Sequence, residues 1–163
     1  MSNDWIDAEG FRANVGIILT NSAGKLLLGG RAGSKGWQFP QGGVQVGEDP
    51  EDAMYRELRE EVGLERNDVE LLGVTSDWLR YRLPDKFVRR NSTPLCIGQK
   101  QRWFAIRFLG DDDEINITPD DHPIEFDKWR WAASDELLDC IVAFKRDVYR
   151  EVLEEFSEVI RTA

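Results

Sequence analysis

The sequence predicts a single domain of the α/β class in the broad sense, a mixed β-sheet flanked by helices. A chain of 163 residues is long enough for one domain with a real hydrophobic core. Its 41% apolar content and six tryptophans fit a globular protein. Short apolar runs joined by turn residues indicate strands, and two segments with helical periodicity indicate helices.

Five strands and one short extended piece are expected. Residues 14–20 and 25–31 are short apolar runs separated by Asn-Ser-Ala-Gly, which predicts a β-hairpin with a four-residue turn. Residues 37–43, WQFPQGG, indicate a short extended piece that ends in a glycine-rich loop. Three more segments rich in β-branched and aromatic residues are predicted strands: residues 69–75, 103–108 and 127–132. The acidic, turn-rich residues 110–123 are expected to form a loop.

The first helix is predicted at Pro50–Val62. Asp49 suits the N-cap, Pro50 suits the first helical position, and Gly63 suits the residue that follows the helix. One side of this helix carries the apolar residues Met54, Leu58 and Val62. A second helix is predicted over residues 144–160, with a buried stripe of Phe144, Val148, Val152, Phe156 and Ile160.

No apolar run approaches the roughly 20 residues that a membrane-spanning helix needs. The N-terminal residues, MSNDWIDAEGFR, lack the basic start and apolar core of a secretory signal. We therefore expect a cytoplasmic protein. Its only cysteines, Cys96 and Cys140, have no metal-site spacing and are expected to be reduced thiols rather than a disulfide.

The formal net charge of −10 argues against a protein that coats long nucleic acid. The charge is unevenly distributed, because residues 79–102 hold seven basic residues and one acid. This segment has a charge of +6, and the remainder of the chain therefore has −16. A small anionic ligand fits this distribution better than a polymer.

The segment GGVQVGEDPEDAMYRELREEVGL, residues 42–64, gathers Glu57, Glu60 and Glu61 on one helix. Like charges four positions apart destabilise a helix by about 0.2–0.5 kcal/mol. A solvated surface is the simplest interpretation of two such residues, but three of them, with Glu48 on the preceding loop, leave repulsion for which we see no compensation in the sequence. Hard divalent cations such as Mg²⁺ bind carboxylate oxygens together with substrate phosphates. The cluster therefore predicts a metal site.

The same segment resembles the Nudix box, G-x(5)-E-x(7)-R-E-U-x-E-E-x-G-U, in which U is aliphatic. The nine fixed positions are matched by Gly42, Glu48, Arg56, Glu57, Leu58, Glu60, Glu61, Gly63 and Leu64. Chance agreement at nine positions is very improbable. The resemblance implies an α/β/α sandwich with a mixed β-sheet, spanning residues 1–163 as a single domain with its core at about 10–160. It also implies a hydrolase that cleaves a nucleoside diphosphate linked to another group, with Mg²⁺ or Mn²⁺ as cofactor.

The resemblance also implies roles for individual residues. Glu57, Glu60 and Glu61 would bind two to three metal ions, with the carbonyl of Gly42 or Gly43. Arg56 would orient one of these glutamates through a charge-assisted hydrogen bond, and Glu48 would brace the loop. Glu125 resembles an additional carboxylate ligand from outside the box, although a surface glutamate is the simpler interpretation of that residue alone.

Most of the chain is similar to bacterial RNA pyrophosphohydrolases, also called (di)nucleoside polyphosphate hydrolases, and to plant-type diadenosine tetraphosphate hydrolases. The similar stretches include GFRANVGI, WQFPQGG, DWLRYRLP, CIGQKQRWF, EFDKWRW and FKRDVYREV, and Ala13 departs from the proline that is common in bacterial relatives. The similarity implies phosphate or nucleotide contacts by Arg12, Arg31, Gln38 and Lys145. Tyr81 and Phe144 are aromatic residues beside cations and are candidates for stacking on a base, with core packing as the alternative. His122 is expected to have no role.

The substrate implied is therefore the 5′-triphosphate end of RNA, from which pyrophosphate is removed, or a dinucleoside polyphosphate such as diadenosine tetraphosphate, from which ATP is released. The sequence leaves open which glutamate accepts the proton of the attacking water. Two alternatives also stay open: a housecleaning nucleoside triphosphate pyrophosphatase and a non-catalytic, nucleotide-sensing Nudix domain. We expect neither a membrane nor long duplex nucleic acid as a partner.

Overall fold

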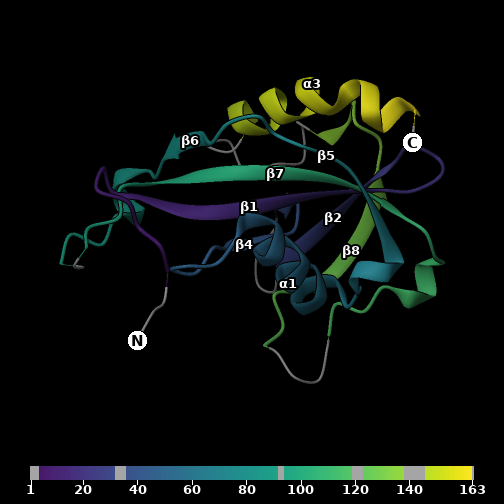
Figure 1. The fold of residues 1–163 in the computed structure, drawn as a ribbon, viewed down its shortest axis with the longest axis horizontal. Coiled ribbons are helices and arrows are strands. Elements are labelled where there is room, and N and C mark those ends of the chain that lie inside the picture. Colours follow the sequence, from purple (N-terminus) through teal and green to yellow (C-terminus); the bar gives the residue numbers. More distant parts are fainter. Residues whose placement is uncertain (1–3, 32–35, 92–93, 119–122, 138–145, 163) are drawn as a thin grey trace.

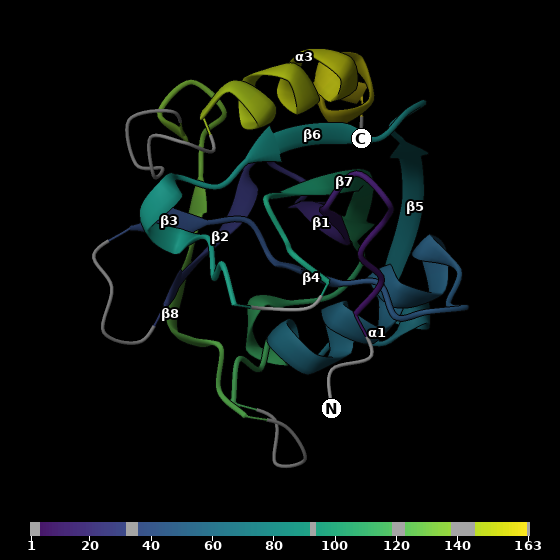
Figure 2. The ribbon, with the colours of Figure 1, turned by 90° about the vertical axis from the view of Figure 1, so that its left-hand side faces the viewer.

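A computed structural model describes residues 4–31, 36–91, 94–118, 123–137 and 146–162. Figure 1 and Figure 2 show a mixed sheet that lies between helices. The strands are β1 (Phe11–Thr20), β2 (Leu26–Arg31), β3 (Trp37–Gln38), β4 (Gln41–Gly43), β5 (Val69–Val74), β6 (Leu79–Arg82), β7 (Gly98–Phe108) and β8 (Phe126–Ala132). Within the described residues the helices are α1 (Pro50–Val62) and α3 (Arg146–Thr162), with short 3₁₀ turns η1 (Arg66–Asp68), η2 (Asp85–Phe87) and η3 (Asp112–Glu114).

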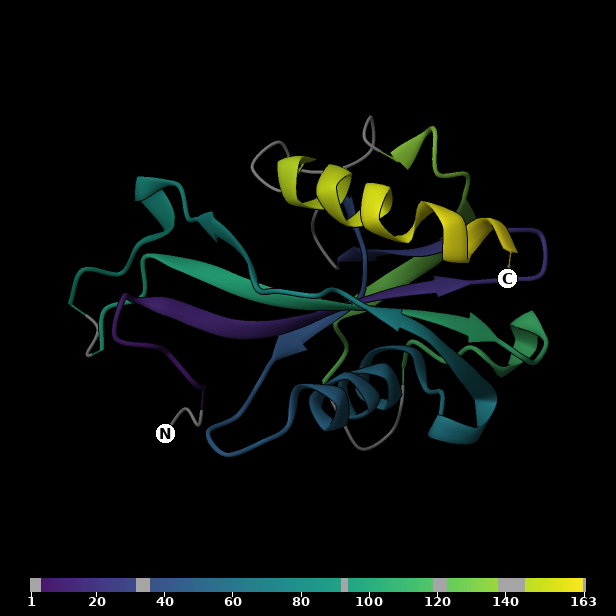
Figure 3. The same cartoon turned by 45° about the horizontal axis from the view of Figure 1, so that its top comes forward.

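The centre of the sheet is a parallel pair of strands, β1 and β7, with ten residue pairs from Phe11–Gly98 to Thr20–Arg107. Side chains alternate between the two faces of a strand. Ala13, Val15, Ile17 and Leu19 therefore pack with the apolar side of α1, whereas Ile18 packs with that of α3. Figure 3 shows the two helices on opposite faces of the sheet, so the predicted α/β/α sandwich is confirmed.

The expected hairpin between β1 and β2 is confirmed at its turn. The side chain of Asn21 accepts hydrogen bonds from the backbone N–H groups of Ala23 and Lys25, at 3.0 Å each. Within the described residues the two strands pair only at Thr20 and Leu26 and then diverge. β4 takes the vacated place beside β1, which sets Gly43 opposite Asn14. The glycine-rich loop thereby reaches the middle of the sheet.

Several element boundaries differ from those expected. Pro40 has no N–H to donate, and residues 39 and 40 divide the expected extended piece into β3 and β4. β7 begins at Gly98 rather than at residue 103, and β6 was not expected as a strand. α1 has the predicted boundaries. In α3, the predicted stripe is buried at Val148, Val152, Phe156 and Ile160.

Some predictions for the C-terminal third of the chain concern residues that the structure does not describe. These residues are His122, Cys140, Phe144 and Lys145. Among the helices that are described, none combines the length and the apolar content needed to cross a bilayer.

Candidate metal and phosphate site

The site is built on α1, whose ends are fixed by local chemistry. The Asp49 side chain accepts a hydrogen bond from the N–H of Glu51 at 2.8 Å, and Gly63 ends the helix with φ of 73°. Glu57 and Glu61 are only 9% and 3% exposed, so two of the three acids are buried rather than solvated. The interpretation of the cluster as a solvated helix face is therefore wrong for these two residues.

Arg56 compensates much of the repulsion between the acids. Its guanidinium donates to Glu48 at 2.9 and 3.0 Å, to Glu57 at 2.7 Å and to Glu60 at 3.3 Å. It also donates to the carbonyl of Gly43 at 2.8 Å. The compensation that was not visible in the sequence is thus supplied by Arg56, which was expected to orient only one of these glutamates. The sequence concealed this arrangement because the loop before α1 must fold back for Glu48 and Gly43 to reach Arg56.

One positive charge does not balance the whole cluster. Burial raises the pKa of Glu57 to about 7, and the nearby charges of Glu60 and Glu125 act in the same direction. Burial, together with the charges of Glu57 and Glu125, raises the pKa of Glu61 well above its usual value. The N–H of Gln41 donates to Glu61 at 2.9 Å and opposes this shift only in part. Glu57 and Glu61 are therefore more stable with a bound proton or a bound cation than as two uncompensated carboxylates.

Gly42 allows the close approach of the glycine-rich loop to this pair. A Cβ atom at position 42 would overlap the carboxyl group of Glu57. The backbone of β4 consequently lies directly against the acidic side chains of α1. Only glycine fits at this position without moving Glu57.

A cleft of about 380 Å³ joins the acids to the cations that were expected to bind phosphate. Arg12 forms an ion pair with Asp4 at 3.1 Å, and Arg31 forms one with Glu125 at 3.5 Å. Nine predicted site residues line the cleft: Arg12, Arg31, Gln38, Gly42, Arg56, Glu57, Glu60, Glu61 and Glu125. Residues of β1, β2, β3, β4 and α1 thus form one site with both carboxylates and guanidinium groups.

Comparison with known proteins identifies the fold and the motif together. The NUDIX domain model matches residues 10–155. The chain belongs to the Nudix family. It is 53% identical over 152 residues to the RNA pyrophosphohydrolase of Pseudoalteromonas translucida strain TAC 125, covering 93% of this chain and 88% of the relative. It is 54% identical over 157 residues to the RNA pyrophosphohydrolase of Pseudomonas putida strain F1, covering 96% and 98%.

Solved Nudix-type structures share the fold at much lower identity. The E. coli dihydroneopterin triphosphate pyrophosphohydrolase has a TM-score of 0.70 and 16% identity, covering 88% of this chain and 95% of that one. A binary complex of the C. elegans Ap4A hydrolase has a TM-score of 0.63 and 17% identity, covering 90% and 98%. The family match and the curated relatives make this protein a Nudix hydrolase, which acts on phosphoric anhydride bonds.

Nudix enzymes generally use divalent metal ions, and the donor set of this chain fits such an ion. Glu57, Glu60 and Glu61 offer the carboxylate oxygens that hard cations bind, and two of them are buried with raised pKa values. No three potential ligands among the described residues already stand in the geometry of a metal cage. Arg56 contacts Glu57 through Oε1 and Glu60 through Oε2, and these contacts fix the orientation of both carboxylates.

The aromatic candidate Tyr81 differs from its expected role. Its side chain is 9% exposed and packs in the core on the α3 side of the sheet. Burial raises the pKa of Tyr81 to about 12. The ring therefore contributes to the core in this structure instead of presenting a face to a base. The other candidates, Phe144 and Lys145, lie outside the described residues.

Sequence reasoning missed several polar residues of the cleft. Asn14, Gln41 and Gln45 line it, and the side-chain amide of Gln101 donates to Asn14 at 2.8 Å. Only Asn14 had a signal in the sequence, as an amide beside the apolar run of β1. Asp4 was also missed, because it contacts Arg12 only after the N-terminal segment has paired with Gln45.

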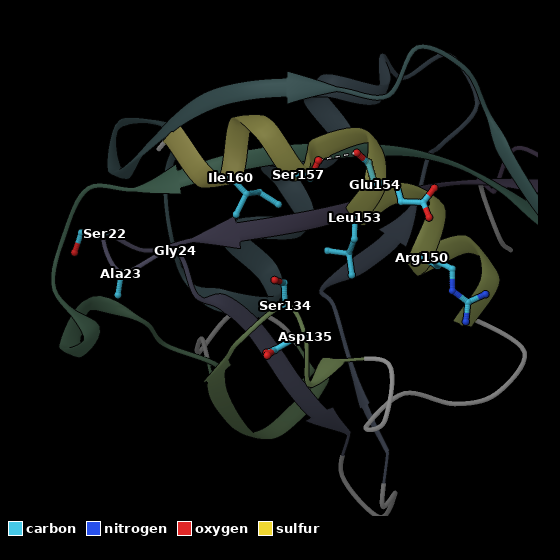
Figure 4. A pocket seen from close by; sticks show the side chains of 10 residues that line it. All are labelled: Ser22, Ala23, Gly24, Ser134, Asp135, Arg150, Leu153, Glu154, Ser157 and Ile160. Carbon is cyan, nitrogen blue, oxygen red and sulfur yellow. Dashed lines mark hydrogen bonds between the residues drawn. The ribbon is translucent and has the colours of Figure 1, made fainter.

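A larger hollow, of about 700 Å³, lies away from these residues (Figure 4). It is formed by the turn between β1 and β2, by residues after β8 and by one side of α3, and its lining includes Arg150, Leu153 and Glu154. None of the residues that line it is a predicted site residue. Size alone therefore does not locate the site, and the Nudix box does.

Proposed function

We propose that this protein removes pyrophosphate from the 5′-triphosphate end of RNA, cleaves dinucleoside polyphosphates such as diadenosine tetraphosphate, or does both, with Mg²⁺ or Mn²⁺ as its cofactor. The single observation that carries the proposal is the cleft in which the Nudix acids and the cations Arg12 and Arg31 lie together. The names of relatives at 53–54% identity support RNA as the substrate. Two to three ions would bind together with the substrate.

The residues of the cleft have separable tasks in this proposal. Arg12 and Arg31 exchange their carboxylate partners for phosphate oxygens, because guanidinium groups bind phosphate with two hydrogen bonds. Arg56 holds Glu48, Glu57 and Glu60 in place. Bound divalent ions supply a water of lowered pKa and neutralise phosphate charge.

A carboxylate of the cleft accepts the proton of the attacking water. Glu57, Glu60, Glu61 and Glu125 are the candidates. Pyrophosphate and a 5′-monophosphate RNA are the products of the RNA reaction, and ATP is released from diadenosine tetraphosphate. Because newly made RNA ends and free nucleotides are the substrates, we infer a cytoplasmic location.

The direct test offers a 5′-triphosphorylated RNA and diadenosine tetraphosphate side by side to one preparation with Mg²⁺. We expect release of pyrophosphate from the RNA, and the ratio of kcat/KM values ranks the two substrates. Cleavage of a nucleotide sugar, with neither of these cleaved, would overturn the substrate assignment. Nucleotide binding without metal-dependent product release would indicate a sensing domain.

A further inference from the structure

The cations of residues 79–102 are concentrated at the edge of the sheet. β6 pairs with β7 and with no other described strand, so it is an edge strand. We call residues 79–90, which comprise β6, η2 and the residues after η2, the basic arm. Five cations of the basic arm are exposed: Arg80, Arg82, Lys86, Arg89 and Arg90. In a protein with a net charge of −10, this is a local reversal of sign.

The basic arm contains one acid, Asp85, which does not neutralise it. Asp85 forms an ion pair with Arg90 at 3.9 Å, and the two side chains are 95% and 70% exposed. Exposed pairs of this kind contribute little to stability and are screened by salt. The arm also presents Phe87, which is 51% exposed and has the Lys86 ammonium 5.1 Å from its ring centre. Exposed aromatic rings among cations are typical of surfaces that bind single-stranded nucleic acid.

The basic arm begins beside the cleft. Arg12, which lines the cleft, is opposite Gln99 of β7, and Gln99 is opposite Tyr81 of β6. Adjacent strands are about 4.8 Å apart, so β6 runs about 10 Å from Arg12. A chain that leaves the cleft therefore reaches the arm within a few nucleotides.

We propose that the basic arm binds the RNA chain downstream of its 5′-terminal nucleotides. The proposal rests on the function proposed above. A dinucleoside polyphosphate ends at its second nucleoside and gains nothing from cations beyond the cleft. An RNA chain has one phosphate per nucleotide to offer them.

The test compares a short and a long substrate. The arm variant combines Lys86→Gln, Arg89→Gln and Arg90→Gln. A matched control with the same change of charge combines Lys25→Gln, Arg66→Gln and Arg150→Gln, which are exposed and lie outside the arm and the cleft. Each protein is assayed on a 5′-triphosphorylated dinucleotide and on a 5′-triphosphorylated, unstructured RNA of about 20 nucleotides, longer than one typical single-strand binding site.

For the long RNA we expect the arm variant to lower kcat/KM roughly tenfold at low salt, mainly through KM. The slope of log kcat/KM against log salt concentration should become shallower by about 2, since each lost phosphate contact on a single strand removes about 0.7. Kinetics on the dinucleotide should match those of the wild type. Equal losses on both substrates, or equal effects of arm and control variants, would overturn the proposal. If the arm instead binds an acidic protein, the arm and control variants would have equal effects on cleavage of the RNA.

Binding of a 5′-monophosphorylated RNA of the same length, measured by fluorescence anisotropy, separates the two proposals. If the wild type binds this RNA more tightly than the arm variant but cleaves no triphosphorylated RNA, the proposed function fails and the role of the arm stands. If the wild type cleaves the dinucleotide and the arm variant binds the long RNA as tightly as the wild type does, the role of the arm fails and the proposed function stands.

Discussion

Arg56 shows how much of the site depends on the geometry of single side chains. Sequence reasoning placed this residue beside the acids and gave it one glutamate to orient. The structure adds Glu48, Glu60 and the Gly43 carbonyl as acceptors. The pattern of residue types predicted the cluster, but it did not predict which donors would reach which acceptors, because that depends on how the loop of residues 43–49 folds.

Arg56→Lys is expected to keep the charge and lose the planar donor fork, because a lysine ammonium cannot contact Glu48, Glu57 and Gly43 at once. We expect turnover to fall by about 10–100-fold, the usual effect of losing a group that orients metal ligands. Steady-state kinetics over a Mg²⁺ titration measure the loss. Arg66→Lys on the exposed surface is the control, and equal activity of the two variants would contradict the role of Arg56.

Glu60→Gln tests the metal site itself. The substitution keeps the shape of the side chain and removes the charge that a divalent cation needs. We expect turnover to fall by roughly 100-fold or more, with circular dichroism and melting temperature close to those of the wild type. Near wild-type turnover in a folded variant would remove Glu60 from the metal ligands.

Elements with strong local signals were predicted well, and elements defined by their neighbours were not. α1 has a capping aspartate, a first-turn proline and a terminating glycine, and its boundaries were correct. β7 carries Gln99, Lys100 and Gln101, which read as polar loop residues although the sheet buries them. Lys100 is accommodated by an ion pair with Asp7 at 3.2 Å and by the rings of Trp5 and Trp78. Such contacts, between residues distant along the chain, have no local signature.

The C-terminal end of α1 gives a prediction at the scale of a single element. Gly63 has φ of 73°, and a Cβ at this position would lie 2.7 Å from the backbone oxygen of Asn116. Gly24 has a similar φ of 75° with nothing within 4 Å of its Cβ position. Gly24→Ala is expected to cost about 1–2 kcal/mol through backbone strain alone, and Gly63→Ala more, because the clash adds to it. Urea unfolding of both variants measures the difference, and equal costs would contradict the clash.

At the scale of the whole molecule, the fold class, the family and the position of the cleft could be predicted from the sequence. The pKa values of the acids could not, because they depend on burial that no residue pattern gives. The proximity of the basic arm to the cleft could not be predicted either. It depends on the pairing of β6 with β7 and of β7 with β1.

The raised pKa values predict how metal-free protein responds to pH. The folded chain keeps protons on Glu57 and Glu61 that the unfolded chain releases near pH 4.5. Stability from these groups is therefore complete below pH 4.5 and is lost as the pH rises through about 7. We expect the melting temperature without metal to fall by roughly 5–10 °C between pH 5 and pH 8.

Two controls accompany this measurement. Mg²⁺ should restore much of the lost stability at pH 8, because a bound cation replaces the protons. A variant with Glu57→Gln and Glu61→Gln should show little of the fall, since neither group can then ionise. A wild-type melting temperature that rises between pH 5 and pH 8 without metal would contradict the shifts.

The parallel pairing of β1 with β7 has a consequence for the synthesis of the chain. The paired residues are 87 positions apart, as for Phe11 and Gly98, and contacts of such long range form slowly. As the chain grows from its N-terminus, β1 has no partner on that side until the ribosome has added β7. Until then the apolar residues of β1 are exposed to other nascent chains. Aggregation or chaperone binding would occur during this interval.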